Sequence, residues 1–376
     1  TTLDFDLQNF GNPSMAMMDV TGTLQVNSTV TVNVKSEVPG IGEVPLLHSA
    51  QRTGSGSFVV GELPVGVQGY VTFGTPTYPN TLVLVVTQAG SPRWAGMLPD
   101  FTVDGTWDIN DTMNWIEMTT LGPTAYREGN PVLFDDSAIG TTTINLVTTV
   151  HPGSVTFANE FLSYVLSGTG SISGDTGLRK AGAGDLTISN RNEYTGPTVI
   201  ESGRLVMAGS EARSMLVLTN AETTVQFSAN HVSTEGLALS SRAGHSGETV
   251  LVDPGVQATL RGLHGGNDGH STWFYGGGAL RLVDSTSLYQ GRLRLNDFEL
   301  IIDSGAVLSQ DSASVFASQI GSGAVPNVLP GSTGILTVQG DGQYIQTAQG
   351  LRLGSDANGA TGILNVRDEG WVSVPL

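Results

Sequence analysis

The sequence predicts an all-β protein whose short strands stack into a β-solenoid, and three observations indicate this fold. Short apolar runs alternate with turns rich in Gly, Asn, Asp and Pro along nearly the whole chain. Only 13% of the residues are charged, whereas glycine occurs 50 times in 376 residues. Two segments also repeat a pattern, and runs this short bury a core only when similar layers stack on them.

Composition narrows the expected partners and compartment. The net charge is −18 with only 16 Lys and Arg residues, so a nucleic-acid partner is not expected, because phosphate contacts require basic side chains. Cysteine is absent, and a large stacked core does not need disulfides. No apolar run is long enough for a membrane-spanning helix. The start at Thr1 rather than Met predicts a removed leader or a fragment of a longer protein.

Residues 1–100 form a first β-rich segment. Thr21–Ser36 alternates apolar and polar residues, as a strand with one buried face does. Further apolar runs follow at regular spacing, and this spacing also suits a β-sandwich. We interpret the segment as part of the solenoid or as its cap, because it resembles the closing part of a repeat unit in giant bacterial surface proteins.

Residues 101–140 form an aromatic-rich junction, with a boundary expected near residues 94–107, where Pro, Gly and two tryptophans occur together. Trp107, Trp115, Tyr126 and Phe134 follow one another within this stretch. We predict that these rings cover an end of the solenoid or pack at the junction. An exposed platform on which sugars stack is the alternative.

Residues 141–376 are regular, and we assign them to a parallel solenoid. Within them, residues 177–205 string short apolar strands between glycine and asparagine turns. Apolar residues of this stretch are expected to point inward, namely Leu178, Leu186, Ile188, Val199 and Leu205. Its charged residues are expected to stay in water, namely Lys180, Asp185, Arg191 and Glu193.

This stretch resembles the autotransporter-associated β-strand repeat, found in passenger regions of large bacterial surface and secreted proteins. The matching positions are Gly177, Leu178, Lys180, Gly182, Gly184, Leu186, Ile188, Asn192, Tyr194, Gly196, Thr198, Ile200, Gly203 and Leu205. The resemblance implies a right-handed parallel β-helix with irregular loops, and roles in surface display, adhesion or structural support. It implies an extracellular or cell-surface location and brings no catalytic residues.

A second repeat lies in residues 333–376. TGILTV at Thr333–Val338 recurs as TGILNV at Thr361–Val366, 28 residues later, and Gly342 and Gly370 show the same offset. A shared period with a shared apolar face indicates stacked units. This portion resembles another glycine-rich repeat of bacterial surface proteins, which is also β-helical.

No group of residues indicates catalysis, so an enzyme is not expected. The best carboxylate pair is Asp135–Asp136, but neighbouring strand residues point to opposite faces and cannot flank one bond. We interpret both as turn residues. GTGSISG at Gly168–Gly174 lacks the Gly-Lys-Ser/Thr of a phosphate loop. No cofactor is expected.

Metal binding is a secondary hypothesis at two places. A glycine-rich stretch holds three candidate ligands for one metal ion, namely His264, Asp268 and His270. We prefer to interpret this stretch as a surface loop without a metal. Adventitious calcium is the other alternative, at the separate turn residues Asp341, Asp356 and Asp368.

The same glycine-rich loop ends in three aromatic residues, Trp273, Phe274 and Tyr275. Aromatic side chains on an exposed loop suit contact with a protein partner or a glycan, so these residues are our candidate binding site. The alternative is that the rings fold back onto the flank of the solenoid.

These observations predict a secreted or cell-surface scaffold with a structural or adhesive role. The final residues, GWVSVPL, lack an obvious cap, and exposed strand edges invite pairing. We therefore expect self-association, as a homo-oligomer or as a filament of subunits stacked end to end. A carbohydrate-binding or polysaccharide-degrading β-helix is the main alternative, and a trimeric tail-spike-like adhesin is a third.

Overall fold

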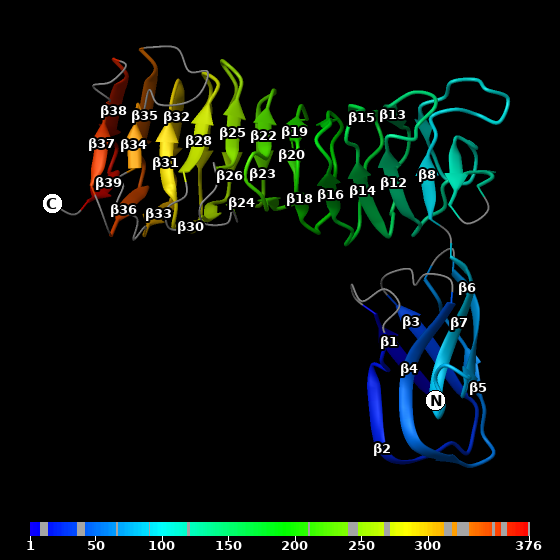
Figure 1. Cartoon of the computed structure of the whole chain (residues 1–376). Coiled ribbons are helices and arrows are strands. Elements are labelled where there is room, and N and C mark those ends of the chain that lie inside the picture. Colours follow the sequence, from blue (N-terminus) through cyan, green and yellow to red (C-terminus); the bar gives the residue numbers. More distant parts are fainter. Residues whose placement is uncertain are drawn as a thin grey trace. The chain divides into compact units, whose positions relative to one another are not determined.

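The regular elements of the described residues in the computed structural model are all β-strands, which confirms the all-β prediction (Figure 1). The structure describes residues 1–7, 14–35, 42–64, 67–89, 91–118, 121–209, 211–239, 247–266, 271–311, 318–321, 331–347, 350–354 and 359–374. The chain forms two compact units. Unit 1 comprises Thr1–Asp104, Asp108–Leu133 and His151–Val155, and unit 2 comprises Gly105–Trp107, Phe134–Val150 and Thr156–Leu376.

Unit 1 begins with two small sheets around one hydrophobic core. The first is parallel, in the order β1 (Thr2–Asp6), β3 (Val30–Lys35), β5 (Phe58–Val60). The second has the order β2 (Met18–Gln25), β4 (Gly42–Thr53), β7 (Thr81–Ala89), β6 (Val67–Phe73). Alternate residues of these strands are buried between them, among them Val32, Val34, Leu46, Leu82 and Leu84.

Among the described strands of residues 1–89, β1, β3 and β5 pair in parallel and so do β2 and β4, as in the solenoid segment that we favoured. Antiparallel pairing, which is closer to the sandwich alternative, is confined to β4, β7 and β6. β4 pairs with β7 and β6 pairs with β7 in antiparallel fashion. For β6 and β7 the reason is the short connection from Phe73 to Thr81, where the N–H of Thr75 donates to the carbonyl of Tyr78 and the chain reverses direction. Strands joined by so short a turn pair antiparallel, whereas stacked coils require a longer path between parallel strands.

Unit 1 also holds short strands of the aromatic-rich stretch. They are β8 (Pro92–Trp94), β10 (Trp115–Glu117), β11 (Pro123–Thr124) and β12 (Pro131–Asp135). The last two residues of β12 belong to unit 2. β8, β10 and β11 pair antiparallel, and β12 pairs parallel with β8.

Unit 2 is a parallel β-solenoid, as predicted, and the fold has about 13 turns. Three stacks of strands form it. Sheet 1 runs, from β14 on, through β14 (Ser154–Ala158), β16 (Leu178–Ala181), β18 (Thr198–Ile200), β21 (Leu216–Leu218), β24 (Leu237–Leu239), β27 (Leu263–Gly265), β30 (Thr286–Tyr289), β33 (Val307–Gln310), β36 (Gln343–Gln346) and β39 (Trp371–Ser373).

Sheet 2 has 11 strands and sheet 3 has 7. Sheet 2 consists of β9 (Thr106–Trp107), β13 (Thr143–Leu146), β15 (Tyr164–Ser167), β17 (Asp185–Ile188), β19 (Arg204–Met207), β22 (Thr224–Phe227), β25 (Thr249–Val252), β28 (Ser271–Tyr275), β31 (Arg292–Leu295), β34 (Ser318–Ile320) and β37 (Leu351–Leu353). Sheet 3 begins further along the chain and consists of β20 (Glu211–Ala212), β23 (His231–Ser233), β26 (Gln257–Leu260), β29 (Ala279–Leu282), β32 (Phe298–Ile302), β35 (Thr333–Val338) and β38 (Thr361–Val366).

The core of unit 2 is a set of ladders in which each coil places an apolar residue over the one before it. One ladder of sheet 2 crosses eight successive strands through Tyr164, Leu186, Leu205, Val225, Val250, Phe274, Leu295 and Ile320. All eight side chains have 0% exposure. Because each residue covers its neighbours along the stack, a strand of three or four residues is enough to hold a coil in place.

Glycines at the corners allow this close stacking. Gly182 follows β16 with a φ of +82°, a left-handed conformation that suits glycine. A Cβ atom there would lie 2.3 Å from the carbonyl oxygen of Asn159 in the coil before it. The corner therefore needs glycine for both its backbone angle and its contact with the next layer.

The four aromatic residues that we singled out in the junction are buried, whereas Phe101 of the same stretch is 80% exposed. Trp94 meets Trp115 edge to face at 4.8 Å between ring centroids in unit 1. In unit 2, Phe134 stacks on Phe157 at 4.4 Å and meets Trp107 at 5.5 Å. All five rings are at most 1% exposed, so they serve core packing and not an exposed sugar-stacking platform.

The second repeat stacks on itself. Thr333–Val338 pairs with Thr361–Val366 residue for residue, from Thr333 with Thr361 to Val338 with Val366. Tyr344 of β36 pairs with Val372 of β39 in the same way. The 28-residue period is therefore the length of one coil in this part of the solenoid.

Candidate functional site

The predicted aromatic site lies on a strand of sheet 2 rather than on a loop. Trp273, Phe274 and Tyr275 belong to β28, so the prediction of a protruding loop was wrong at these positions. Phe274 points inward with 0% exposure, whereas its two neighbours point outward and are partly exposed. The glycines at 276–278 mark the corner after this strand, with φ of +119° at Gly276. The arrangement matches our alternative interpretation, in which the aromatic rings lie on the flank of the solenoid.

Stacking brings arginines beside these aromatic rings. Trp273 pairs with Arg294 of β31, Arg294 with Gln319 of β34, and Gln319 with Arg352 of β37. Trp273, Tyr275, Arg292, Arg294, Gln319 and Arg352 thus lie on the outward side of neighbouring strands, and we call this surface the arginine–aromatic face.

Arg294 is the central group of the arginine–aromatic face. Its guanidinium carbon lies 4.8 Å from the centroid of the Trp273 ring, which is a cation–π contact. Its Nε donates to the hydroxyl of Ser271 at 3.0 Å, and its Nη1 donates to Oε1 of Gln319 at 3.4 Å. These contacts fix the guanidinium plane against the indole and link three successive coils.

Positive charge is concentrated on this face. Burial, and then the positive charge of Arg292, lower the pKa of Arg294 to about 10, and burial lowers the pKa of Arg292 as well. Arg204, four strands earlier in sheet 2, shows the opposite behaviour, because its hydrogen bond to Asp185 raises its pKa. Strands β25, β28, β31, β34 and β37 contain three arginines and no Asp or Glu, in a chain with 34 acidic residues.

The carboxylate pair Asp135–Asp136 is engaged in turn contacts. Asp135 accepts a hydrogen bond from the backbone N–H of Ser137 at 2.9 Å. Asp136 accepts from three consecutive backbone N–H groups of the following coil, those of Glu160, Phe161 and Leu162, at 2.7–2.9 Å. Burial works to raise the pKa of Asp136, but these three donors outweigh it and hold the pKa below its ordinary value.

The histidine hypothesis falls partly outside the described residues. His264 lies on β27 and is partly exposed, whereas Asp268 and His270 lie outside the described part of the chain. Within the described ranges, no cluster of three His, Asp or Glu side chains has the geometry to hold a metal ion.

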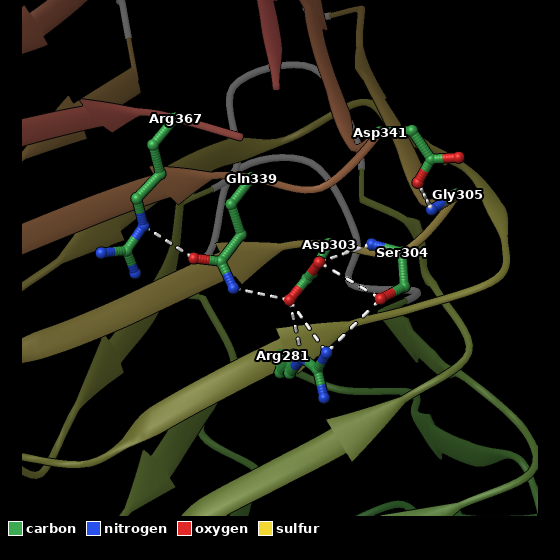
Figure 2. Close-up of polar contacts among 7 residues, drawn as sticks. All are labelled: Arg281, Asp303, Ser304, Gly305, Gln339, Asp341 and Arg367. Atoms are coloured by element: carbon green, nitrogen blue, oxygen red, sulfur yellow. Dashed lines mark hydrogen bonds and ion pairs between the residues drawn. The ribbon is translucent and has the colours of Figure 1, made fainter. Parts of the chain in front are cut away.

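The aspartates at the corners of sheet 3 connect coils. Figure 2 shows Arg281, Asp303, Gln339 and Arg367 in a continuous ladder across four coils. Arg281 donates to Oδ2 of Asp303 at 2.9 and 3.1 Å, Gln339 donates to the same oxygen at 2.6 Å, and Arg367 donates to Gln339 at 2.8 Å. Burial works to raise the pKa of Asp303, but the hydrogen bonds from Gln339 and Arg281 have the larger effect and hold the pKa below its ordinary value. This carboxylate therefore stays charged.

The calcium candidates are individual turn residues where the structure describes them. Asp341 accepts a hydrogen bond from the backbone N–H of Gly305 in the preceding coil (Figure 2). Asp368 sits in a turn with a φ of +53°. Asp356 lies outside the described residues.

The repeat at 177–205 contains a buried cation that sequence reasoning placed in water. Lys180 has 0% exposure, and its Nζ donates to the carbonyl oxygens of Ala181, Gly182 and Ser202 at 3.1, 2.7 and 3.3 Å. Lys180 points inward because it shares the alternation of Leu178, two residues before it on β16. Val199 was also misplaced, since it lies on the outward side of β18.

Asparagines of the same repeat satisfy its turn. The side chains of Asn190 and Asn192 donate to each other's oxygen at 3.2 Å. Asn192 also accepts from the backbone N–H of Ile172 and Asn190 donates to the carbonyl of Gly170, both in the coil before. Side-chain amides thus replace the backbone hydrogen bonds that the turn interrupts.

An open hollow of about 490 Å³ lies on the outer side of sheet 3. Two carboxylates line it, Asp297 and Glu299, and each accepts a hydrogen bond from the next coil, from the N–H of Thr333 and the hydroxyl of Thr337. The aromatic residue in its lining, Phe298, is 3% exposed. The hollow therefore lacks the exposed aromatic rings that a sugar-binding groove with paired acids would present.

The fold and the repeat define a β-solenoid of the passenger type. The Passenger-associated-transport-repeat family matches residues 178–207, the stretch from β16 through β19. Over 129 residues, 33% of the chain, the sequence is 31% identical to the Neisserial autotransporter lipoprotein NalP of Neisseria meningitidis serogroup B. Over 268 residues, 64% of the chain, it is 26% identical to the adhesin BmaC autotransporter of Brucella suis biovar 1. No solved structure matches the chain.

These findings confirm the resemblance recognised in the repeat. The chain is a β-helix protein that is similar to autotransporter passengers, and this similarity supports an extracellular or cell-surface location. The matches span 11% of NalP and 7% of BmaC. In the described ranges, no helix has the length and apolarity needed to cross a membrane.

Proposed function

We propose that this protein is a non-enzymatic surface scaffold with a structural and adhesive role. The observation that carries the proposal is the uninterrupted stack of coils, whose polar side chains mainly link one coil to the next. The hydrogen bonds that Asp136 accepts from the following coil are one example, and the ladder from Arg281 to Arg367 is another. A stack of this kind presents a long and stiff outer surface, which suits display and attachment.

The relatives support this direction. BmaC is named an adhesin, and both relatives are autotransporters. Acidic net charge keeps such a surface soluble outside the cell. In contrast, the carboxylate pairs that an enzyme acting on polysaccharides needs are occupied here by turn and inter-coil hydrogen bonds.

Adhesion is tested by coupling the purified protein to beads and measuring their retention on host cells and on abiotic surfaces. We expect retention above that of beads carrying an inert protein of similar size and charge. The same preparation is incubated with a panel of plant and microbial polysaccharides. Release of reducing ends with no retention on any surface would contradict the proposal and favour the polysaccharide-degrading alternative.

Self-association is the finer part of the proposal. Strands β38 and β39 leave large apolar side chains exposed, with Trp371 51% and Val366 49% exposed. A further coil would cover them, whether it comes from a second copy or from the same polypeptide. Sedimentation velocity over a range of concentrations checks this. We expect association that Trp371→Glu weakens, and monodisperse monomers at the highest concentration would refute the filament model.

A further inference from the structure

We propose that the arginine–aromatic face of sheet 2 binds an anionic glycan, a linear polysaccharide that carries carboxylate or sulfate groups and lies across successive coils. The proposal rests on the adhesive role given above and names its ligand class.

The first argument is charge. The face gathers Arg292, Arg294 and Arg352 on strands without a single acidic residue, although the chain as a whole carries a net charge of −18. Elsewhere in the solenoid, four arginines form ion pairs with carboxylates, namely Arg179, Arg191, Arg204 and Arg281. Such a local positive surface attracts a ligand with spaced negative groups, whereas the rest of this acidic protein's surface repels the ligand. Nucleic acid fits less well, because its dense phosphates would also meet the surrounding acidic surface.

The second argument is the chemistry of the side chains. Guanidinium groups bind carboxylate and sulfate oxygens through paired N–H donors. Trp273 and Tyr275 provide flat apolar faces beside them, and such faces suit the C–H surfaces of sugar rings. Arg294 lies 4.8 Å from the Trp273 ring, so a ligand that stacks on the indole meets the guanidinium as well. A sugar bearing an acidic group offers both surfaces in one unit.

The third argument is spacing. Successive coils are about 4.8 Å apart, so the three steps from Trp273 on β28 to Arg352 on β37 span roughly 14 Å. Polar groups recur along this line, with Gln319 between Arg294 and Arg352. The line runs along the stack of coils, and a short run of sugar residues in an extended polysaccharide covers it. A linear polymer therefore meets several of these side chains at once, and each adds to its affinity.

The test measures binding of the purified protein to polygalacturonate and to dextran sulfate, with neutral dextran as the reference polymer, at low and high salt. Arg352→Glu changes an exposed residue and Arg294→Gln changes the central one. Arg204→Gln is the matched control, because this arginine lies on the same sheet but is paired with Asp185. Circular dichroism and thermal melting confirm that each variant is folded.

We expect binding to at least one anionic polymer that weakens with salt and little retention on neutral dextran. Arg352→Glu and Arg294→Gln should each weaken binding about tenfold, whereas Arg204→Gln should leave it within about twofold. The two anionic polymers show whether carboxylate or sulfate is preferred. If neither is bound at low salt, or if Arg204→Gln weakens binding as much as Arg352→Glu, the proposal is overturned. Adhesion that none of these arginine substitutions changes would overturn it too and leave the adhesive role standing.

Discussion

Lys180 allows a direct test of how the repeat at 177–205 is stabilised. Its ammonium group is buried and donates to three backbone carbonyl oxygens, those of Ala181, Gly182 and Ser202. An ammonium has three N–H donors, so the three carbonyls match its full capacity. Lys180→Met keeps an unbranched side chain, one atom shorter, and removes every donor, which leaves the corner without these hydrogen bonds.

The expected cost follows from two opposing contributions. Each hydrogen bond from a charged donor contributes about 1.5–3 kcal/mol, and three are lost. Burial of an ammonium costs several kcal/mol, and the substitution recovers this part. We therefore expect Lys180→Met to lower the free energy of unfolding by about 2–4 kcal/mol.

The pH dependence of stability provides a second measurement of the same group. Burial lowers the pKa of Lys180 from 10.5 to about 8, although the negative charges of Asp185, Glu160 and Asp136 oppose the shift. Between pH 8 and 10.5 the unfolded chain binds a proton that the folded chain has released, so this lysine makes stability rise with pH in that window. The difference in stability between the wild type and Lys180→Met should change accordingly between pH 7.5 and pH 9.5, because the other titrating groups are common to both.

Urea denaturation followed by far-ultraviolet circular dichroism measures the loss, and hydrogen exchange across residues 177–205 locates it. Arg179→Met is the matched control, since Arg179 is the next residue but faces outward, where its ion pair with Glu201 is exposed to solvent. An exposed pair contributes about 0–1 kcal/mol. If Arg179→Met costs as much as Lys180→Met, or if Lys180→Met stabilises the protein, the buried hydrogen bonds do not have the role assigned to them.

Three further predictions concern core packing, a corner glycine and a buried histidine. Phe134→Ala removes a fully buried ring that stacks on a neighbouring phenylalanine at 4.4 Å, and we expect calorimetry to show a loss of about 3–5 kcal/mol. Gly168→Ala should cost clearly more than about 1 kcal/mol, because its φ is +109° and the added Cβ would lie 2.2 Å from the carbonyl oxygen of Leu146. Gly74→Ala has similar backbone strain but open space around it, and an equal loss of melting temperature in the two variants would contradict the steric argument. Burial lowers the pKa of His231 from 6.5, so the unfolded chain takes up a proton first and stability should fall as the pH drops below about 6.5. His231→Gln should flatten this acid-side decline in melting temperature, and an unchanged profile would show that other groups cause it.

Much of the solenoid could be predicted because it follows local rules. The alternation in DLTI at Asp185–Ile188 and the glycine at Gly182 fix which side faces inward and where the chain turns. The recurrence of TGIL between Thr333 and Thr361 directly predicts which residues stack. Alternation and corner turns recur from coil to coil, so a short window of sequence already contains them.

The first segment shows why similar strand patterns do not determine topology. The strands of residues 1–89 have the same alternation as the later coils, and their spacing fits a sandwich as well as a solenoid. The short reversal between Phe73 and Thr81 makes β6 and β7 antiparallel, whereas β1, β3 and β5 stay parallel as stacked coils do. The aromatic strand at 271–275 was misread for a related reason, since the flanking glycines suggested a loop although STWFY itself alternates as a strand does.

The sequence by itself determined that this protein is built from stacked β-coils of the passenger type, because glycine corners and inward apolar positions are encoded coil by coil. Only the tertiary structure decided which outward residues become neighbours. Trp273, Arg294, Gln319 and Arg352 lie one coil apart but at unequal intervals along the chain, since the turns between strands differ in length from coil to coil. Their common line on sheet 2 arises from hydrogen-bonded register between coils, and the burial of Lys180 likewise follows from the coil that closes over it.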